Sequence, residues 1–348
     1  MTAVRYLGLI VGCVVLLTSC RSAGSNDDPN TYIEPEYPKK IHRTVNRISK
    51  DILLGNVMAV DVVDSLVIIR GRNVDNDNVF HAVSLRDGTV IKSFCNYGRG
   101  DKELTNYLCT AINPERTHMT CIETGKILDI DIAGAITGKT DFITESAAAG
   151  GRNTTLSIID LGDGILHVEG GDSRFFITDK AMADTTARYN VYPQIAKESD
   201  PQADKAYFSI NSHPAANPDR SRFAIVTHYG MILEIFRIKD HQIEPIVIRR
   251  FYQPRLKNEI FPAEDCIWGA TGIYATDKFI YVVYYETAKP NNSMRRMGVF
   301  DWKGKEICVY DFDCTIRQFA VTPDDSRVYC WTQNEEGEEY LGYFDLEH

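Results

Sequence analysis

The chain has 348 residues, of which 44% are hydrophobic and 25% charged, and these proportions exclude a disordered chain, a collagen-like repeat and a multi-span membrane protein. Lys and Arg number 38 against 48 Asp and Glu, a formal net charge of −10, which argues against a nucleic-acid partner held by bulk positive charge. The 18 Tyr and 15 Phe residues, together with few stretches of helical periodicity, favour an all-β chain.

The N-terminus carries a targeting signal. Residues 6–17 form an apolar run that follows Arg5. The run is too short to cross a bilayer core of about 30 Å as a helix, and its length suits the core of a secretory signal. A membrane anchor is the alternative. The run ends in Leu-Thr-Ser-Cys at residues 17–20, which resembles the lipobox of bacterial lipoproteins and implies that Cys20 is lipidated. We therefore expect a lipoprotein signal peptide over residues 1–19.

Residues 20–38 contain Gly, Ser, Asn, Asp and three prolines with little apolar periodicity, a composition typical of a flexible tether. Arg rather than Asp stands at position 21. By resemblance to lipoprotein sorting in Gram-negative bacteria, Arg21 implies the outer membrane, with membrane contact made through the lipid. The sequence leaves open whether the folded domain faces the periplasm or the outside.

From about residue 41 the chain repeats one unit of about 50 residues six times. Each unit begins with a short apolar strand, a tight turn and a second apolar strand; three of the turns place Pro beside an acidic residue, which suits a turn. A third and a fourth strand complete the unit as an antiparallel meander. The six turns are marked by Asp64, Arg116, Asp163, Ser221, Asp277 and Ser326.

Six such units predict an all-β fold, a six-bladed β-propeller of four-stranded antiparallel blades over residues 39–348. A β-sandwich or an array of small sheets is the alternative, and neither explains six near-equal periods. The sixth unit ends just after its third strand, Tyr340 to Leu346, which would leave an open edge. We expect an N-terminal strand within residues 41–54 to supply the fourth strand and close the ring.

Two segments carry a family resemblance. Residues 93–104, SFCNYGRGDKEL, are similar to a glycine-rich link (fG-x-G-x-G-E) after a first blade, and residues 300–305, FDWKGK, resemble a hairpin (fdw-x-G-k) of a fifth blade. With the lipobox and the repeats, these segments resemble the six-bladed TolB-like β-propeller lipoproteins of Bacteroidota. Lys102 stands where that family tends to have Gly. The resemblance implies the fold and the location, and little chemistry.

Motifs for catalysis or cofactors are absent from the sequence, which contains no HExxH, GxSxG, P-loop or CxxC. We therefore predict no catalytic residue, no metal site and no cofactor. Residues 75–78, Asp-Asn-Asp-Asn, could ligate calcium, but no Glu follows at the required spacing and a solvated loop is favoured. The seven cysteines after Cys20 lie in apolar strand sequence, typical of buried thiols. A disulfide between Cys109 and Cys121, equidistant from the turn residue Glu115, stays open as an alternative.

Arg and aromatic side chains, the usual anchors of recognition surfaces, occur in the links between blades and in the loops between second and third strands. In a propeller these segments gather on one face around the channel mouth. They carry Arg72, Tyr97, Arg99, Tyr107, Arg255, Trp268, Arg295 and Arg296, beside the acidic Asp101, Glu103, Glu259 and Asp265.

Our hypothesis is that Arg99, Tyr107 and Trp268 flank a shallow pocket for a polar small molecule or glycan, or for a loop of a partner protein. Local ion pairs on an ordinary polar rim, with Trp268 in the core, are the alternative. The sequence thus predicts a non-enzymatic, lipid-anchored outer-membrane binding module with no nucleic-acid partner. A propeller lyase or hydrolase with its site at the mouth of the central channel is the alternative function.

Overall fold

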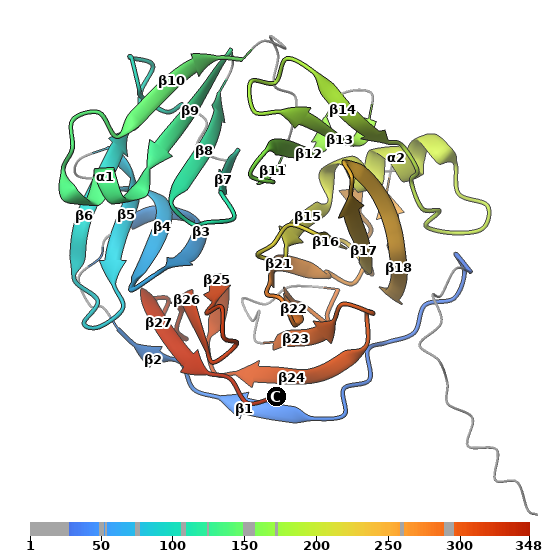
Figure 1. The fold of residues 1–348 in the computed structure, drawn as a ribbon. Helices are drawn as coiled ribbons and strands as arrows, with labels where there is room; N and C mark the ends of the chain where they lie inside the picture. The colour runs from blue at the N-terminus through green and yellow to red at the C-terminus, as the bar shows by residue number, and fades with distance from the viewer. Residues whose placement is uncertain are drawn as a thin grey trace, which may run out of the picture.

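The computed structural model describes residues 28–48, 52, 54–73, 77–105, 109–123, 125–148, 157–170, 173–257, 261–288 and 296–348. Six antiparallel sheets are arranged in a ring (Figure 1). This arrangement confirms the predicted six-bladed propeller, and the six predicted turns each join the first and second strands of a blade.

The first three blades are each one continuous stretch of chain. Blade 1 contains β3 (Leu54–Val63), β4 (Leu66–Asn73), β5 (Asn78–Ser84) and β6 (Val90–Asn96). Blade 2 contains β7 (Thr110–Ile112), β8 (His118–Glu123), β9 (Lys126–Asp131) and β10 (Ile143–Ala147). Blade 3 contains β11 (Ser157–Asp160), β12 (Gly164–Gly170), β13 (Ser173–Asp179) and β14 (Thr185–Tyr189).

The last three blades include the two that receive strands from the N-terminus. Blade 4 contains β15 (Ser212–Ala216), β16 (Arg222–Thr227), β17 (Met231–Lys239) and β18 (Gln242–Tyr252). Blade 5 contains β21 (Ala270–Ala275), β22 (Phe279–Tyr284), β23 (Arg296–Asp301) and β24 (Glu306–Phe312). Blade 6 contains β25 (Thr315–Val321), β26 (Arg327–Gln333) and β27 (Glu339–Asp345).

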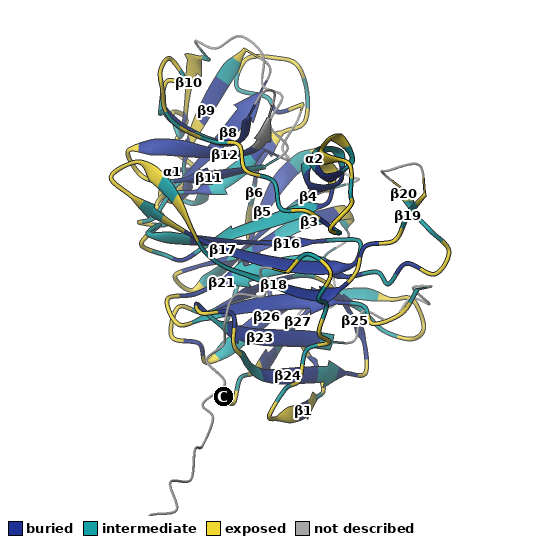
Figure 2. Ribbon diagram, turned by 90° about the vertical axis from the view of Figure 1, so that its right-hand side faces the viewer, coloured by how far each residue is buried: buried dark blue, intermediate teal, exposed yellow. Residues whose placement is uncertain are grey.

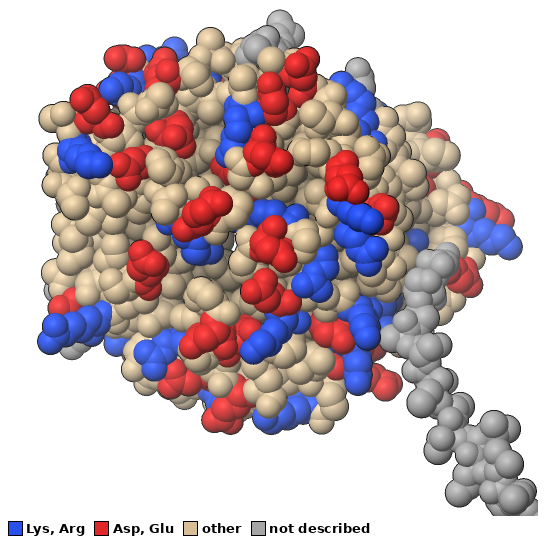
Figure 3. Space-filling view, in the orientation of Figure 1, with Lys and Arg blue, Asp and Glu red and all other residues tan. Residues whose placement is uncertain are grey.

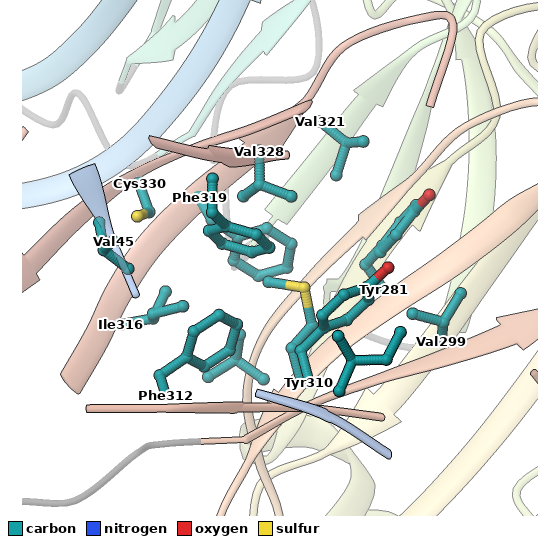
Figure 4. Packing of buried hydrophobic residues seen from close by; sticks show 14 of the residues in the cluster. Val45, Tyr281, Val299, Tyr310, Phe312, Ile316, Phe319, Val321, Val328 and Cys330 are labelled. Carbon is teal, nitrogen blue, oxygen red and sulfur yellow. The ribbon is translucent and has the colours of Figure 1, made fainter. Parts of the chain in front are cut away.

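The second and third strands of each blade are covered on both faces by neighbouring blades, which explains why they read as continuous apolar runs rather than alternating ones. In β4, for example, Val67, Ile68 and Ile69 are all 2% exposed or less. Figure 2 shows the buried residues along the strands and the exposed ones at the turns. Between blades 5 and 6, Figure 4 shows the rings of Tyr281 and Phe319 in one apolar cluster.

The N-terminal segment closes the ring. Strand β2 (Asn46–Arg47) pairs antiparallel with β27 and completes blade 6, as predicted. The segment does more than predicted, because β1 (Lys40–Arg43) also pairs with β24, in parallel, and adds a fifth strand to blade 5. Val45, between the two strands, is buried in the cluster shown in Figure 4.

The predicted tether over residues 20–38 is too long at its C-terminal end. Residues 28–38 lie against the propeller: the hydroxyl of Tyr32 donates to the carbonyl of Ile195 at 2.8 Å, and the ring of Tyr37 packs edge-on against Phe300 with centroids 5.8 Å apart. Their packing depends on partners far along the chain, so local composition could not reveal it. Cys20 and the signal peptide lie outside the described residues.

Three small elements within and between the blades were not predicted. Helix α1 (Ile132–Thr137) lies between β9 and β10, and α2 (Pro201–Ile210) links blades 3 and 4. The side chain of Asp200 accepts from the backbone N–H of Gln202 at 2.8 Å and caps α2, as Asp before Pro often does. The hairpin of β19 (Leu256–Lys257) and β20 (Phe261–Pro262) links blades 4 and 5. Neither α1 nor α2, the helices among the described residues, is long and apolar enough to cross a membrane.

Both segments that resemble the family form tight turns. The side chain of Asp301 accepts from the backbone N–H groups of Lys303 and Lys305 at 2.8 and 2.9 Å, which fixes the hairpin between β23 and β24. In the link after blade 1, the side chain of Glu103 accepts from the N–H of Gly100 at 2.7 Å. Lys102 in this link has φ +57°, the left-handed region that favours glycine, which explains the glycine at this position of the family pattern.

Candidate functional site

The first strands of all six blades line a central channel with a cavity of about 470 Å³. These strands lie at the inner edge of each sheet. The N–H and C=O groups that do not pair within the sheet therefore face the channel rather than another strand. We call the side that carries the turns between first and second strands the turn face. The other side, which carries the links between blades and the loops between second and third strands, is the link face.

Two arginines cross the turn-face end of the channel. The side chain of Arg220, in the first turn of blade 4, donates to the carbonyl of Asp160 at 3.0 Å and to that of Ile112 at 2.8 Å. Nη2 of Arg116, in the first turn of blade 2, donates to the carbonyl of Val62. These guanidinium groups therefore satisfy carbonyl groups at the inner sheet edges and join neighbouring blades.

Arg116 and Arg220 occupy the same position in the repeat, and Asp325 occupies it in blade 6. All three have φ near +58 to +59°, and each contacts the blade that precedes its own. The carboxylate of Asp325 accepts from the hydroxyls of Thr276 and Tyr281 in blade 5 at 2.6 and 2.8 Å. We call Arg116, Arg220 and Asp325 the bridging residues.

Asp61, on β3, is a carboxylate in the channel that takes no part in the contacts of the bridging residues. It lines the cavity, and it forms no hydrogen bond or ion pair with any residue that the structure describes. Burial raises the pKa of Asp61, and the positive charges of Arg116, Arg70 and Arg220 partly offset that rise. The other lining carboxylate, Asp160, is paired with Lys180.

The link-face end is aromatic instead. The ring of Trp268 lies 5.3 Å from that of His228, 5.5 Å from Tyr229 and 6.2 Å from Tyr285, measured between centroids. The ring of His213, which lines the channel, lies 5.9 Å from that of His228. We call these five residues the aromatic group.

The two histidines of this group are neutral near pH 7. Burial lowers the pKa of His213 to about 4, with a smaller contribution from His228. Burial also lowers the pKa of His228, although the bond of its Nδ1 to the carbonyl of Ala270 at 2.9 Å opposes this. A carbonyl only accepts, so Nδ1 carries the proton. These imidazoles act as packed rings, since a general base needs a pKa near the working pH.

The predicted pocket does not assemble as one site. Trp268 lies on the link face, half-buried, in the link between blades 4 and 5. Arg99 is exposed in the link between blades 1 and 2, which is the opposite side of a ring of six blades. Tyr107 lies outside the described residues. Arg99 and Trp268 therefore stand across the channel mouth from each other rather than side by side.

The other three predicted rim arginines that the structure describes are held in local ion pairs, as the polar-rim alternative predicts, and Arg295 lies outside the described residues. Arg72 contacts Asp77 at 2.5 Å. Arg255 pairs with Asp265. Arg296 pairs with Asp311 at 2.6 Å and with Glu286. Figure 3 shows acidic and basic side chains interspersed over the visible side of the molecule.

The cysteines are packing residues. All seven after Cys20 are buried thiols: Cys95, Cys109, Cys121, Cys266, Cys308, Cys314 and Cys330. The alternative of a disulfide between Cys109 and Cys121 is wrong, because Thr110 is the residue opposite Cys121 in the ladder of β7 and β8. The offset of one residue turns the two side chains to opposite faces of the sheet, where Cys109 packs with Ile158 and Cys121 with Leu128.

Within the described ranges, no group of three or more His, Cys, Asp or Glu side chains is placed to hold a metal ion. Residues 75 and 76 of the acidic loop lie outside those ranges.

Sequence analysis missed Asp61 and the roles of Arg116 and Arg220, although Arg116 served as a turn marker. The available signal was a charged residue following the Pro-acidic pair in the first turns of blades 2, 4 and 6.

Comparison with known proteins agrees with this architecture. A family model described as "TolB-like 6-blade propeller-like" matches residues 36–324. No curated protein matches the chain. Among solved structures, "Structure of U3-55K" is similar at 9% identity and a TM-score of 0.52, over 87% of this chain and 98% of that one. "Crystal structure of RRP9 WD40 repeats" is similar at 9% identity and a TM-score of 0.50, over 86% and 96%. At such identities these similarities concern the fold alone.

Proposed function

The chain belongs to the TolB-like six-bladed propeller family, and on this premise we propose that it is a non-enzymatic binding module held at the outer membrane by a lipid on Cys20. The apolar run and the Leu-Thr-Ser-Cys sequence at residues 17–20 support the lipid, and Arg21 supports the outer membrane. Propellers suit binding because loops from all blades converge around one channel mouth.

The observation that carries the binding proposal is an exposed aromatic ring in the link between blades 4 and 5, on the link face. Phe261, on the hairpin of β19 and β20, is 65% exposed, and Figure 2 shows that hairpin standing out from the edge of the molecule. The same link carries Trp268 of the aromatic group. Large exposed rings near half-buried ones are typical of protein recognition surfaces, so we propose a partner protein on this face.

Partner capture with matched variants tests the binding face. The full-length protein is purified from detergent-solubilised membranes after amine-reactive cross-linking, and bound proteins are identified by mass spectrometry. Phe261→Ser is expected to lose a partner that the wild type captures. Val90→Ser is the control, because Val90 is 40% exposed at the start of β6, beside the turn from β5 on the turn face. Loss in both variants, or in neither, would contradict the proposed face.

Fractionation tests the anchor separately. Cys20→Ala removes the thiol that the lipid would occupy, and we expect the protein to move from the membrane fraction to the soluble fraction. Cys95→Ala, which changes a buried thiol of β6, controls for general effects of cysteine loss. Retention of the Cys20→Ala protein in membranes after an alkaline wash would contradict lipid anchoring.

Asp61 favours one second function, a propeller lyase or hydrolase. A carboxyl whose pKa is raised by burial can hold a proton closer to neutral pH and act as a general acid. If the protein turned over a substrate, Asp61→Asn would abolish the reaction without weakening substrate binding. Unchanged turnover in that variant would exclude Asp61 as the acid.

A further inference from the structure

The central channel contains more positive than negative charge. Arg70, Arg116 and Arg220 line it, while Asp160 is neutralised by Lys180. Asp61 is then the one lining carboxylate without a partner among the described residues. A low-dielectric cavity with this excess attracts an anion, because burial strengthens charge interactions that water would screen.

Arg116 has donors that no described residue uses. It hydrogen-bonds through Nη2, to the carbonyl of Val62 and more weakly to the hydroxyl of Tyr274. Its Nη1 and its buried Nε make no hydrogen bond with a described residue. Arg220, by contrast, uses Nε, Nη1 and Nη2 on three carbonyls. A carboxylate in the channel would therefore bind Arg116, as guanidinium groups favour.

The remaining polar groups call for hydrogen-bond donors on the ligand. The carboxylate of Asp61 accepts nothing from the described residues. The inner edges of six sheets add backbone carbonyls around the cavity. A ligand that presents hydroxyls along its length would satisfy both, whereas an apolar chain would leave Asp61 buried without a hydrogen bond, which is costly.

We propose that the central channel binds a small polyhydroxylated carboxylate, with its carboxylate on Arg116 and a hydroxyl on Asp61. The ligand enters from the link face, because the side chains of Arg116 and Arg220 cross the other end. A cavity of about 470 Å³ holds a ligand of six carbons with room for water. This site names a ligand class for the proposed binding module, but it depends neither on the lipid nor on Phe261.

Three matched six-carbon probes test the ligand class by calorimetric titration of the purified propeller. D-gluconate has the carboxylate and the hydroxyls, sorbitol has the hydroxyls alone, and hexanoate has the carboxylate alone. We expect gluconate to bind at least about tenfold more tightly than either control, since each control loses one set of hydrogen bonds. Equal binding of the three probes, or no binding of gluconate at millimolar concentration, would overturn the proposal.

Two variants place the site. Arg116→Gln is expected to weaken gluconate binding by about tenfold, while Arg237→Gln, which changes the net charge equally at a 55% exposed side chain, leaves it unchanged. Asp61→Asn removes the negative charge, so hexanoate binding should strengthen and the preference for gluconate should fall. If Arg116→Gln does not fold, the binding of gluconate and hexanoate to Asp61→Asn tests the placement of the site on its own. If Asp61→Asn leaves the affinities for gluconate and hexanoate unchanged, the proposed placement of the site is wrong. This outcome is independent of the effect of Phe261→Ser on partner capture.

Discussion

The two ends of the central channel are built from different chemistry. At the turn face, charged side chains of the bridging residues bond to groups of the preceding blade. At the link face, aromatic and neutral imidazole rings pack between blades 4 and 5, and backbone comes close to backbone. The charged end joins neighbouring blades, and the aromatic end is the one on which we propose that a partner binds.

This difference leads to different sensitivities. Substitutions at the link face should act through steric fit, because the contacts at this face are apolar. They should also act through the protonation state of the buried histidines. Changes at the turn face should act through unsatisfied carbonyls, because Arg116 donates to one of them and Arg220 to three. The four predictions below separate these causes, beginning with the largest effect.

Gly269→Ala should destabilise most. A Cβ at Gly269 would lie 1.5 Å from the carbonyl oxygen of Gly230, so the loop of blade 4 and the link to blade 5 must separate. We expect the free energy of unfolding to fall by more than about 3 kcal/mol, measured by urea denaturation. Gly337→Ala, at φ +86° with no atom within 4 Å, controls for alanine at an exposed turn and should cost about 1 kcal/mol. Equal losses would show that the close approach does not matter.

Arg220→Asn tests the turn-face end. Asn tolerates the positive φ of this position, so the change isolates the loss of bonds to the carbonyls of Asp160, Asn217 and Ile112. We expect a loss of about 2–3 kcal/mol in the free energy of unfolding. Arg237→Asn, at an exposed ion pair of 3.7 Å, should change it by less than about 0.5 kcal/mol. An Arg220 variant as stable as this control would contradict the bridging role.

The pH dependence of stability tests the link-face end. The pKa of His213 is about 4 in the folded protein against 6.5 when unfolded, so the unfolded chain binds the extra proton between these values. Stability from this group is present above pH 6.5 and is lost as pH falls toward 4. We expect His213→Gln to remove about 2 kcal/mol of that loss, measured as the difference in unfolding free energy between pH 7 and pH 4.5.

The matched control is His42→Gln, because His42 is exposed on β1. That variant should keep the wild-type difference between the two pH values. The buried His167, whose pKa is also lowered to about 4, contributes equally in all three proteins. An unchanged pH dependence in His213→Gln would show that this ring is not held neutral by burial.

Lys102→Gly should have the smallest effect, and in the opposite direction. Glycine adopts φ +57° without the strain that a side chain imposes, while it increases the entropy of the unfolded chain. We expect a gain of about 0.5 kcal/mol in the free energy of unfolding. Lys92→Gly, at an exposed position within β6, should instead destabilise. A loss in both variants would contradict the account of the link.

Local chemistry was enough to predict the ring. The Pro-acidic turns lie where they were expected because Pro and Asp fix turn geometry without distant partners. Closure followed from counting strands in the last unit. The packing of Tyr37 and the bonds of Arg220 could not be predicted, because both depend on contacts between blades that are distant in sequence. Arg99 and Trp268 were grouped by face alone, and their positions around the ring separate them.

A crystal structure of the protein with D-gluconate would test the central claim most directly. The account predicts ligand density in the channel, with the carboxylate about 3 Å from the guanidinium of Arg116 and a hydroxyl at a similar distance from the carboxylate of Asp61. The same soak of Arg116→Gln crystals should leave the channel without the ligand. Density for gluconate only outside the channel, or in the channel with its carboxylate away from Arg116, would contradict the claim.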